Sequence, residues 1–245
     1  MLDDHQLAAN LAARAGALLL GVRAEGLGER TGDEGDRRAN TFLLDGLHEA
    51  RPGDAVLSEE AADDLIRLAA ERVWIVDPLD GTREFGESGR TDWAVHVALW
   101  RAGHGLIAGA VALPALGFTL ATGAVHTAGG GPGSLARTHQ VVVSRTRPPE
   151  SAAMVAHALD SELLPMGSAG AKVCAVIRGE ADAYVHAGGL WEWDAAAPVA
   201  VAVAVGLHVS HVDGSALVFN KERPWTGDLL VCRPELADAA LAALR

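Results

Sequence analysis

The chain has 245 residues, 49% of them hydrophobic and 21% charged, which is a globular composition with enough apolar residues for a full core. Its net charge of −12 at pH 7 argues against a nucleic-acid polymer as partner, because such binding needs a basic surface. No segment reaches the roughly 18 uninterrupted apolar residues of a membrane span, and the acidic start MLDDHQ lacks the basic residues of a signal peptide, so we expect a cytoplasmic protein without a membrane partner.

Apolar residues at helical spacing predict a first helix, with Asp3 or Asp4 as its N-cap. These apolar residues are Leu7, Leu11, Ala15, Leu18, Leu19 and Val22. The polar stretch GERTGDEGD (28–36) predicts a loop, and its last residue, Asp36, caps a second helix that continues through Leu47. The next expected elements are a strand at Ala55–Leu57, a polar helix at Ala61–Arg72 and a strand at Val73–Val76.

The segment WIVDPLDGT (74–82) places two aspartates directly after an apolar strand. Asp77 is expected to leave the sheet where the strand ends. Pro78 fixes φ and donates no backbone hydrogen bond, so the chain turns rigidly and Asp80 comes back towards Asp77. Two converging carboxylates repel each other unless a cation lies between them, and a hard divalent cation with oxygen ligands is the natural candidate.

The end of the same segment suits a phosphate group. Gly81 lets the backbone approach a ligand closely, and Thr82 opens a helical turn whose free N–H groups favour an anion. Taken alone, the segment is equally consistent with an ordinary Asp-Pro turn in which Asp80 is an N-cap.

Strands dominate the middle of the chain, and helices and strands alternate after it. The expected elements are strands at Trp93–Trp100, Leu106–Leu113, Gly117–Ala121 and Val141–Ser144, helices at Glu150–Leu159 and Ala171–Arg178, a strand at Ala183–His186 and a buried apolar helix from Asp194. The glycine-rich GGGPGS (129–134) predicts a surface loop between two lobes. We therefore predict α+β structure with mixed sheets, divided into an N-terminal α+β lobe (1–128) and a C-terminal α/β lobe (135–245) that form one functional unit.

Two further segments end in acids. VLSEE (56–60) is a strand that leads to Glu59 and Glu60, and WEWD (191–194) ends in Asp194, which begins the apolar helix. Asp194 could be only a helix cap, but the two tryptophans around it indicate a cavity wall. Together with the aspartates of WIVDPLDGT, these acids form the set that a two- or three-metal phosphoryl-transfer site needs, including one group to orient water.

Rival phosphate motifs can be excluded from the residues. GSAGAK (167–172) is no Walker A loop, because Ala171 precedes the lysine and Val173 follows it. LDGT is shared with the haloacid dehalogenase phosphatases, but Pro78 stands where their nucleophilic aspartate would be. A covalent aspartyl-phosphate mechanism of that type is therefore not expected.

Three motifs, SEE, WIVDPLDGT and WEWDAAAP, occur in this order and span most of the chain. Together they resemble the lithium-sensitive, magnesium-dependent phosphatases of the inositol monophosphatase superfamily. DPLDGTREF, RPGDAVLSEEA, GSAGAK and HAGGLWEWD are similar to its CysQ branch, especially to actinobacterial CysQ. The resemblance implies a layered αβαβα sandwich, commonly a homodimer, and activity on 3′-phosphoadenosine 5′-phosphate (PAP) in sulfur metabolism.

The resemblance also implies roles for individual residues. Two or three Mg²⁺ ions would be bound by the main-chain carbonyl of Leu79 and the carboxylates of Glu59, Asp77, Asp80 and Asp194. The Thr82 hydroxyl would help Glu59 to orient the attacking water. Asp36 would contribute to the outer metal, although TGDEGD replaces the usual SPVTxAD motif before it. Substrate contacts would come from Gly81, Thr82, Arg83, Ser144, Arg145, Ser168, Lys172 and Asp194.

The leading hypothesis is direct attack of a metal-activated water on PAP, which gives AMP and phosphate without a protein nucleophile. Within the superfamily, the alternatives are an inositol-1-phosphate or a fructose 1,6-bisphosphate phosphatase, and the pair Arg83-Glu84 after DGT favours the nucleotide branch. An alternative from another class is a non-catalytic metal- or nucleotide-binding module. That alternative predicts a gap in the ligand set, and the sequence has none.

Overall fold

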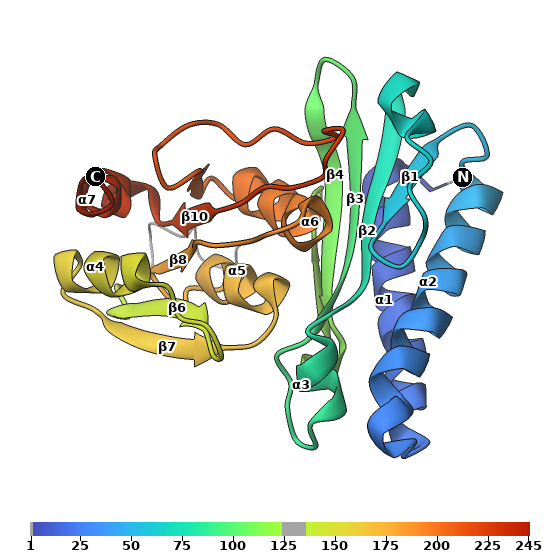
Figure 1. Cartoon of the computed structure of the whole chain (residues 1–245), viewed down its shortest axis with the longest axis horizontal. Coiled ribbons are helices and arrows are strands. Elements are labelled where there is room, and N and C mark those ends of the chain that lie inside the picture. The colour runs from blue at the N-terminus through green and yellow to red at the C-terminus, as the bar shows by residue number, and fades with distance from the viewer. Residues whose placement is uncertain (1, 124–135) are drawn as a thin grey trace.

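The structure, a computed structural model, describes residues 2–123 and 136–245, which form two sheets and the helices around them (Figure 1). The helices are α1 (Asp4–Ala24), α2 (Thr31–Ala50), α3 (Thr82–Gly86), α4 (Glu150–Ala158), α5 (Ala169–Ile177), α6 (Glu192–Ala204) and α7 (Ala237–Ala243). The strands are β1 (Ala55–Ser58), β2 (Arg72–Asp80), β3 (Ala94–Arg101), β4 (Gly105–Leu113), β5 (Phe118–Ala121), β6 (Gln140–Ser144), β7 (Glu162–Met166), β8 (Ala183–His186), β9 (His208–Ser210) and β10 (Leu229–Cys232).

Both sheets are mixed, as the sequence predicted. The first sheet has the order β1-β2-β3-β4-β5, in which β1 and β2 are parallel and the other neighbours antiparallel. The second has the order β7-β6-β8-β10-β9, with β6 parallel to β7 and β8, and β10 antiparallel to its neighbours. Because β1 and β2 are parallel, their C-terminal residues lie side by side at the same end of the first sheet.

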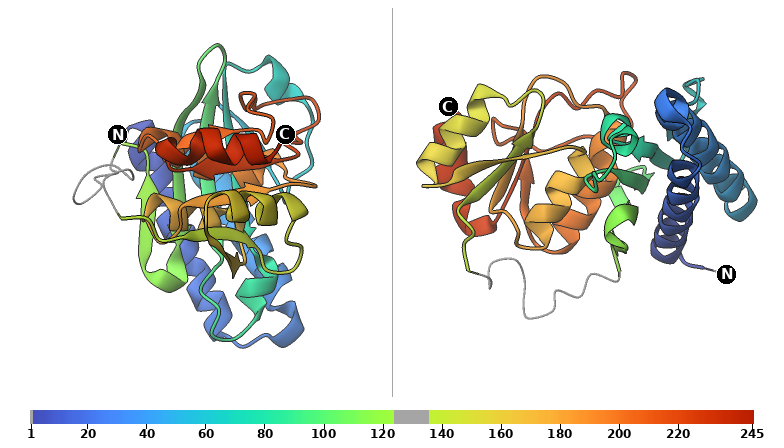
Figure 2. Two further views of the ribbon diagram at one scale, coloured as in Figure 1. Left: turned by 90° about the vertical axis from the view of Figure 1, so that its left-hand side faces the viewer. Right: turned by 90° about the horizontal axis from the view of Figure 1, so that it is seen from below.

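Five layers alternate across the molecule, which confirms the predicted αβαβα sandwich. Figure 2 shows α1 and α2 outside the first sheet, α5 and α6 between the sheets, and α4 and α7 outside the second sheet. Each gap between layers holds buried apolar side chains, and the largest cluster surrounds α5 and α6. This central position explains why α6 is apolar on nearly all sides: a helix between two sheets is covered on most of its surface, and only its last turn, at Val203 and Ala204, is exposed.

The predicted loop at residues 28–36 is wrong, because α2 already begins at Thr31. Gly32 and Gly35 lie on the face of α2 that packs against β2 and α3. A β-carbon on Gly32 would lie 2.7 Å from the Thr82 methyl group, and one on Gly35 would lie 2.8 Å from Phe85. The glycines thus allow close helix packing, and this tertiary contact outweighs their low helix propensity. Asp36 accordingly lies inside α2 and is not its N-cap.

The polar helix predicted at Ala61–Arg72 is also wrong. Only a short 3₁₀ turn at Ile66–Ala69 forms there, and β2 begins at Arg72. The reason is local and tertiary: the Asp63 carboxylate accepts the Leu65 N–H at 3.1 Å, which favours a turn. Asp63 also binds the buried Arg67 guanidinium at 2.7 Å, and Arg67 in turn donates to the Asn220 side chain at 2.7 Å.

Smaller differences concern boundaries. The helices α5 and α6 each begin two residues before the predicted start, and the strand β7 (Glu162–Met166) was not predicted. β7 contains Pro165, which fits an edge strand because proline cannot donate to a ladder. The predicted loop 129–134 lies outside the described residues, and the division into two lobes stays a prediction.

Helix α1 is long and apolar enough, by length and composition, to cross a membrane. Its apolar residues nevertheless pack into the protein, because α1 contacts α2 on one side and β3 and β4 on another. Leu7, Leu11 and Leu19 are buried in this interface. The hydropathy of α1 is therefore explained by the core of the first layer.

Candidate active site

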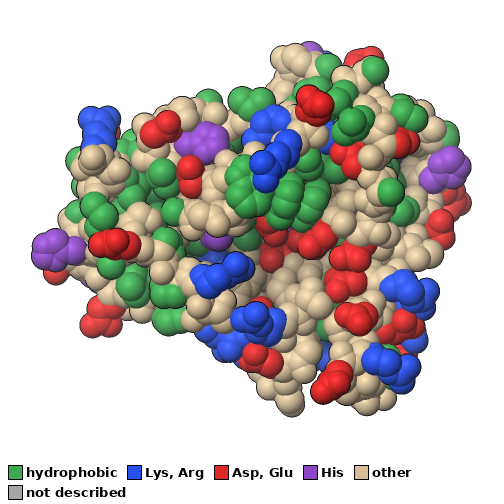
Figure 3. All heavy atoms as spheres, in the orientation of Figure 1, with side chains coloured by type: hydrophobic (Ala, Val, Ile, Leu, Met, Phe, Trp, Pro, Cys, Tyr) green, Lys and Arg blue, Asp and Glu red, His purple; other side chains and the backbone are tan. Residues whose placement is uncertain are grey.

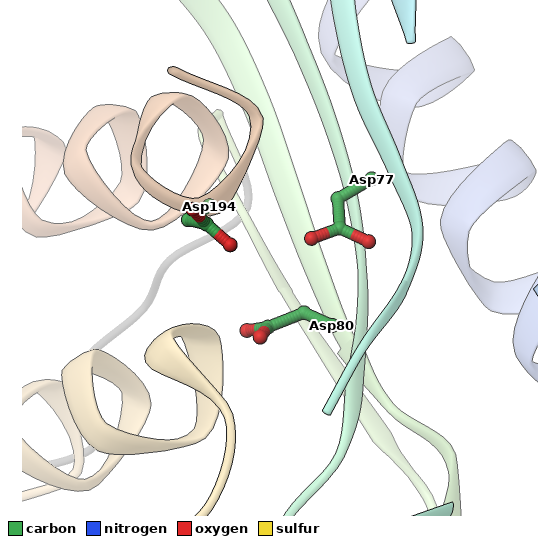
Figure 4. A group of neighbouring side chains, drawn as sticks. All are labelled: Asp77, Asp80 and Asp194. Atoms are coloured by element: carbon green, nitrogen blue, oxygen red, sulfur yellow. The ribbon is translucent and has the colours of Figure 1, made fainter. Parts of the chain in front are cut away.

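Three aspartates converge between the first sheet and α6. Asp77 and Asp80 come from β2, and Asp194 comes from the first turn of α6. One carboxylate oxygen from each lies within 4.8 Å of the other two. Figure 4 shows the three side chains pointing toward one another. The structure thus brings together acids that are more than one hundred positions apart in the sequence.

An irregularity in β2 places Asp77 and Asp80 on the same side. In a regular strand, side chains three residues apart point to opposite faces. Here the pairing of β2 with β3 shifts between Asp77 and Asp80. The Asp77 carboxylate accepts the Leu79 N–H at 3.0 Å, which stabilises this bend, and Pro78 between them has no N–H to lose. The strand therefore continues to Asp80 and does not end at Asp77 as predicted.

Asp194 is held by the start of its own helix. Its carboxylate accepts the Trp191 N–H at 2.7 Å, in the manner of a capping box. The sequence offered two interpretations of Asp194, a helix cap and a site residue. The structure supports both, because one carboxylate can accept the cap hydrogen bond and still face Asp77 and Asp80.

Asp80 is fixed from α5 and from β3. Its carboxylate accepts the Gly170 N–H at 2.7 Å and lies 3.2 Å from Nε2 of the buried His96. The other ring nitrogen of His96 lies 3.0 Å from the Trp193 carbonyl oxygen, so the imidazole connects Asp80 with the start of α6. Burial alone would lower the pKa of His96, but Asp80 and the Trp193 carbonyl outweigh it and raise that pKa above its usual value.

The environment of the three aspartates fits a bound cation. Burial, together with Glu59 and Asp80, raises the pKa of Asp77 well above its usual value. Burial and the same Asp80 raise the pKa of Asp194 to about 7. Asp77 Oδ2 is buried and, among the described residues, has no hydrogen-bond partner. The nearest ring nitrogen of His96, Nδ1, is 4.0 Å from this oxygen, beyond hydrogen-bond distance. A buried carboxylate oxygen without a hydrogen bond, beside two further carboxylates, is costly for the protein alone, and a divalent cation would satisfy it.

Glu59 joins this group from the neighbouring strand. Its N–H donates to the Val76 carbonyl at 3.3 Å, which extends the parallel ladder of β1 and β2 and brings Glu59 alongside Asp77. Glu59 is exposed to solvent, but the protein packed around its carboxylate and the nearby Asp80 raise its pKa to about 7. The predicted position at a strand end therefore explains why Glu59 faces the aspartates.

Thr82 lies where α2, β2 and α3 meet. Its hydroxyl donates to the Leu79 carbonyl at 3.2 Å, so both groups lie at the end of the Asp77–Asp80 bend. Asp36, from α2, is within hydrogen-bonding reach of Thr82. Burial and the charge of Glu60 raise the pKa of Asp36 to about 7. Asp36 thus reaches the site from the helix interior, although the sequence placed it at a helix start.

A cavity of about 430 Å³ opens beside Asp80 and Asp194. Figure 3 shows acidic side chains gathered in a hollow, with hydrophobic side chains on one side and Lys and Arg on the other. The cavity lining includes every residue that the sequence predicted to contact substrate: Gly81, Thr82, Arg83, Ser144, Arg145, Ser168, Lys172 and Asp194. These residues come from both sheets, so the cavity lies at their junction.

The two basic residues expected to bind a second phosphate have different environments. The Arg145 guanidinium pairs with Glu84 at 2.6 Å and with Glu87 at 2.8 Å, and it remains partly exposed. Lys172 is buried, and its ammonium donates to the carbonyl of Ser168 at 3.0 Å and to that of Gly167. Burial lowers the pKa of Lys172 to about 8.

The sequence did not identify every residue at this site. His96 was interpreted only as a core or site-wall residue; its partner Asp80 depends on the bend in β2, which no pattern revealed. Arg147 and Trp225 also line the cavity. Arg147 follows Arg145 by two positions, and this short basic run could have indicated that Arg147 also lines the site. Trp225 had no comparable signal.

Comparisons with known proteins agree with this geometry. The inositol monophosphatase family is matched over residues 5–245. A Mycobacterium leprae protein named 3′-phosphoadenosine 5′-phosphate phosphatase is 49% identical over 255 aligned positions, which cover 100% of this chain and 94% of that protein. A Mycobacterium tuberculosis protein of the same name is 52% identical, and the alignment covers 94% of this chain and 89% of that protein.

Solved structures have the same fold. The crystal structure of CysQ from Bacteroides thetaiotaomicron, a bacterial member of the inositol monophosphatase family, has a TM-score of 0.78 and 27% sequence identity. The superposition covers 94% of this chain and 97% of the CysQ chain. An inositol monophosphatase from Staphylococcus aureus with bound 2′-AMP has a TM-score of 0.77 at 20% identity, covers 96% of this chain and 92% of its own, and supports the fold alone.

Proposed function

Because the chain belongs to the inositol monophosphatase family, we propose that it is a metal-dependent phosphatase that converts PAP to AMP and phosphate. The observation that carries this proposal is the carboxylate triad, of which Asp80 and Asp194 line a cavity that also has a basic wall. A nucleotide with two phosphates needs both features, one for the phosphate that is cleaved and one for the phosphate that stays. The mycobacterial relatives, about half identical over nearly the whole chain, carry the name of this activity.

The metal of this proposal is Mg²⁺, with two or three ions per site. Its ligands are the carboxylates of Glu59, Asp77, Asp80 and Asp194 and the carbonyl of Leu79. Oxygen ligands of this kind suit Mg²⁺, and the Asp77 oxygen that has no hydrogen bond among the described residues supports the assignment. When bound, the ions activate a water molecule, neutralise the phosphate oxygens and stabilise the leaving alkoxide.

The protein's own groups then position the reactants. Glu59, whose pKa is raised, accepts a hydrogen bond from the attacking water, and the Thr82 hydroxyl fixes the direction of that water. Asp36 lies within reach of Thr82 and contributes to the outer metal. His96 keeps Asp80 in place from the opposite side. No protein nucleophile takes part.

Substrate binding follows from the walls of the cavity. Gly81 and Thr82 adjoin Asp80 and bind the scissile phosphate, and Ser168 lies across from them at the start of α5. The second phosphate binds to the wall made by Ser144 and Arg145, with Arg83 contributing positive charge, while Lys172 holds the start of α5 through the carbonyls of Gly167 and Ser168. We further propose a cytoplasmic role in sulfur metabolism and assembly as a homodimer, as expected from the sequence.

Phosphate release from a substrate panel tests the proposal. PAP, inositol 1-phosphate and fructose 1,6-bisphosphate should each be assayed with Mg²⁺ and with a chelator. We expect PAP to have the highest kcat/KM, AMP to be its product, and the chelator to abolish turnover. A higher kcat/KM for inositol 1-phosphate or fructose 1,6-bisphosphate would assign the protein to another branch of the family. No turnover of any substrate would favour a non-catalytic binding module.

A further inference from the structure

The cavity beside the triad has three chemically different walls. One carries the carboxylates of Asp80 and Asp194, and a second carries the basic side chain of Arg145. The third is aromatic and consists of Trp191 and Trp225, which we call the aromatic wall. Figure 3 shows hydrophobic side chains beside the acidic hollow. The proposed function uses the first two walls for phosphates and leaves the third without a role.

The aromatic wall is built into the fold. The Trp191 and Trp225 rings meet edge to face, with centroids 4.8 Å apart and planes at 84°. Trp193 stacks on Trp191 with centroids 5.2 Å apart. The Trp225 segment is anchored by a 2.7 Å hydrogen bond from the Thr226 N–H to the Leu190 carbonyl. The rings are therefore ordered by the protein before a ligand arrives, which lowers the entropic cost of binding.

A glycine makes room for the wall. Gly189 has a φ of +131°, and a β-carbon there would lie 2.8 Å from the edge of the Trp225 ring. Any larger residue would push the ring out of its position. The Arg223 guanidinium lies over the Trp225 ring, 5.3 Å from its centroid. Trp225 nevertheless remains half-buried and is not enclosed, so part of its aromatic surface borders the cavity.

The wall also lies at the correct end of the cavity for a nucleobase. The backbone N–H of Trp191 donates to the Asp194 carboxylate at 2.7 Å, so the wall begins directly beside a proposed metal ligand. In a nucleoside 3′,5′-bisphosphate, the base and both phosphates are attached to one ribose. With the scissile phosphate at the carboxylates and the second phosphate at Arg145, the neutral base is left for the aromatic wall.

We propose that Trp191 and Trp225 bind the purine base of the substrate by stacking, and that this wall selects nucleotides over sugar phosphates and inositol phosphates. The inference rests on the proposed function, because it assumes the same cavity and the same orientation of the scissile phosphate. Stacking of a base on an aromatic side chain is sequence-tolerant, so the wall recognises a planar base and does not read its edges. The wall thus determines the substrate class and takes no part in the chemistry.

Equilibrium binding separates this inference from turnover. Calorimetric titration with AMP and with ribose 5-phosphate, which lacks the base, measures what the base contributes. For the wild type we expect AMP to bind about 5- to 150-fold more tightly than ribose 5-phosphate, the range for one stacked base. In Trp225→Leu, which keeps an apolar side chain without an aromatic face, this ratio should fall towards one. Trp225→Phe should retain most of it.

The control is Trp100→Leu, because Trp100 is another half-buried tryptophan but lines a separate groove. It should leave the AMP to ribose 5-phosphate ratio unchanged. Equal binding of the two ligands by the wild type would overturn the inference, and so would a ratio that Trp225→Leu does not change. Either result would leave PAP hydrolysis intact, whereas a failure of the proposed function would appear as absent PAP turnover in the wild type.

Discussion

The two oxygens of the Asp77 carboxylate differ in their hydrogen bonding. One accepts the Leu79 N–H, and the other is buried and, within the described part of the chain, has no hydrogen-bond partner. Asp77→Asn keeps the shape of the side chain but removes its charge. We expect metal-dependent kcat to fall by more than about 100-fold, since even groups behind a metal ligand contribute 10- to 100-fold. Steady-state assays across Mg²⁺ concentrations measure this loss.

The control for Asp77→Asn is Asp238→Asn, which removes an exposed acid in the first turn of α7. It should keep full activity. Circular dichroism and thermal unfolding should show that Asp77→Asn is folded, because the substitution also relieves repulsion among buried carboxylates. A fully active Asp77→Asn enzyme would contradict the metal site.

Thr82 contributes a hydroxyl that lies at the end of the Asp77–Asp80 bend. If this hydroxyl orients the attacking water, its loss affects mainly the transition state. Thr82→Ala should therefore lower kcat by about 10- to 100-fold, as expected for one hydrogen bond to a charged group, and change KM less. Thr82→Ser, which keeps the hydroxyl, should recover most of the activity. An unchanged kcat in Thr82→Ala would remove this residue from the mechanism.

At the same scale, the sequence predicted the acids better than their supports. Asp77, Asp80 and Asp194 could be predicted because acids at the ends of apolar segments are unusual and chemically informative. His96 and Trp225 could not, because each acts through a partner that is distant in sequence. His96 reaches Asp80 only through the pairing of β2 with β3 and the register shift between Asp77 and Asp80. Such a register depends on the bend in β2, which the sequence does not reveal.

Among the elements, α2 shows why local propensity failed. The segment from Thr31 to Asp36 contains two glycines and three acids, and it was predicted to be a loop. In the structure it is helical, because Gly32 and Gly35 let α2 approach β2 and α3 closely. Packing that the sequence cannot show therefore decided the start of this helix.

This close approach gives a prediction at Gly32. Gly32→Ala should lower kcat by about 3- to 30-fold, because the added methyl group would lie 2.7 Å from the Thr82 methyl group and must displace it. Stability should change little, since the gain in helix propensity offsets part of the overpacking. Gly21→Ala in α1 is the matched control: nothing lies within 4 Å of its β-carbon, so it should be fully active and stabilised by about 0.5–1 kcal/mol. A Gly32→Ala enzyme with unchanged kcat would show that Thr82 tolerates displacement.

The ion pair between α3 and the end of β6 predicts substrate preference. Glu84 and Glu87 hold Arg145 at the cavity, where it can meet the second phosphate of PAP. Arg145→Ala should lower kcat/KM for PAP roughly 10- to 100-fold more than for inositol 1-phosphate, which has no second phosphate. Lys172→Ala should instead weaken both substrates alike, because the Lys172 ammonium binds two carbonyls of its own turn.

The control for these two variants is Arg178→Ala, since Arg178 pairs with Glu180 away from the cavity. Steady-state kinetics on both substrates compare the three enzymes. Equal losses on both substrates in Arg145→Ala would mean that Arg145 supports the fold or the metals. A selective loss in Lys172→Ala would show that its ammonium leaves the carbonyls to bind substrate.

In the whole molecule, the site forms where the first sheet meets the helices between the sheets. The sequence predicted layers and mixed sheets, because apolar strands and an apolar helix must be covered on both sides. It could not predict which edges meet. Asp80 from β2 meets Gly170 from α5, and Arg145, directly after β6, meets Glu84 from α3, only through the packing of the layers. These long-range contacts complete the cavity.

The clustering of buried acids predicts how the stability of the metal-free protein depends on pH. The usual pKa of an aspartate is 3.8. The pKa of Asp77 is raised well above this value, and that of Asp194 is raised to about 7. Between about pH 4 and pH 7 the folded state therefore binds more protons than the unfolded state, and stability falls as pH rises. Asp80, whose pKa is lowered to about 2, opposes this trend only below about pH 5, because above that pH its carboxyl is ionised in the unfolded state as well as in the folded state.

We expect the free energy of unfolding in a chelator to fall by on the order of 2 kcal/mol between pH 5 and pH 7.5, since one pKa unit corresponds to about 1.4 kcal/mol. Urea unfolding at the two pH values measures the change. Added Mg²⁺ should restore stability at pH 7.5 and have less effect at pH 5, where protons occupy the carboxylates. The double variant Asp77→Asn/Asp194→Asn separates this effect from the general repulsion of a chain with net charge −12. Its unfolding free energy should vary less with pH and no longer respond to Mg²⁺, and a variant with the wild-type pH profile would show that the triad does not cause the loss.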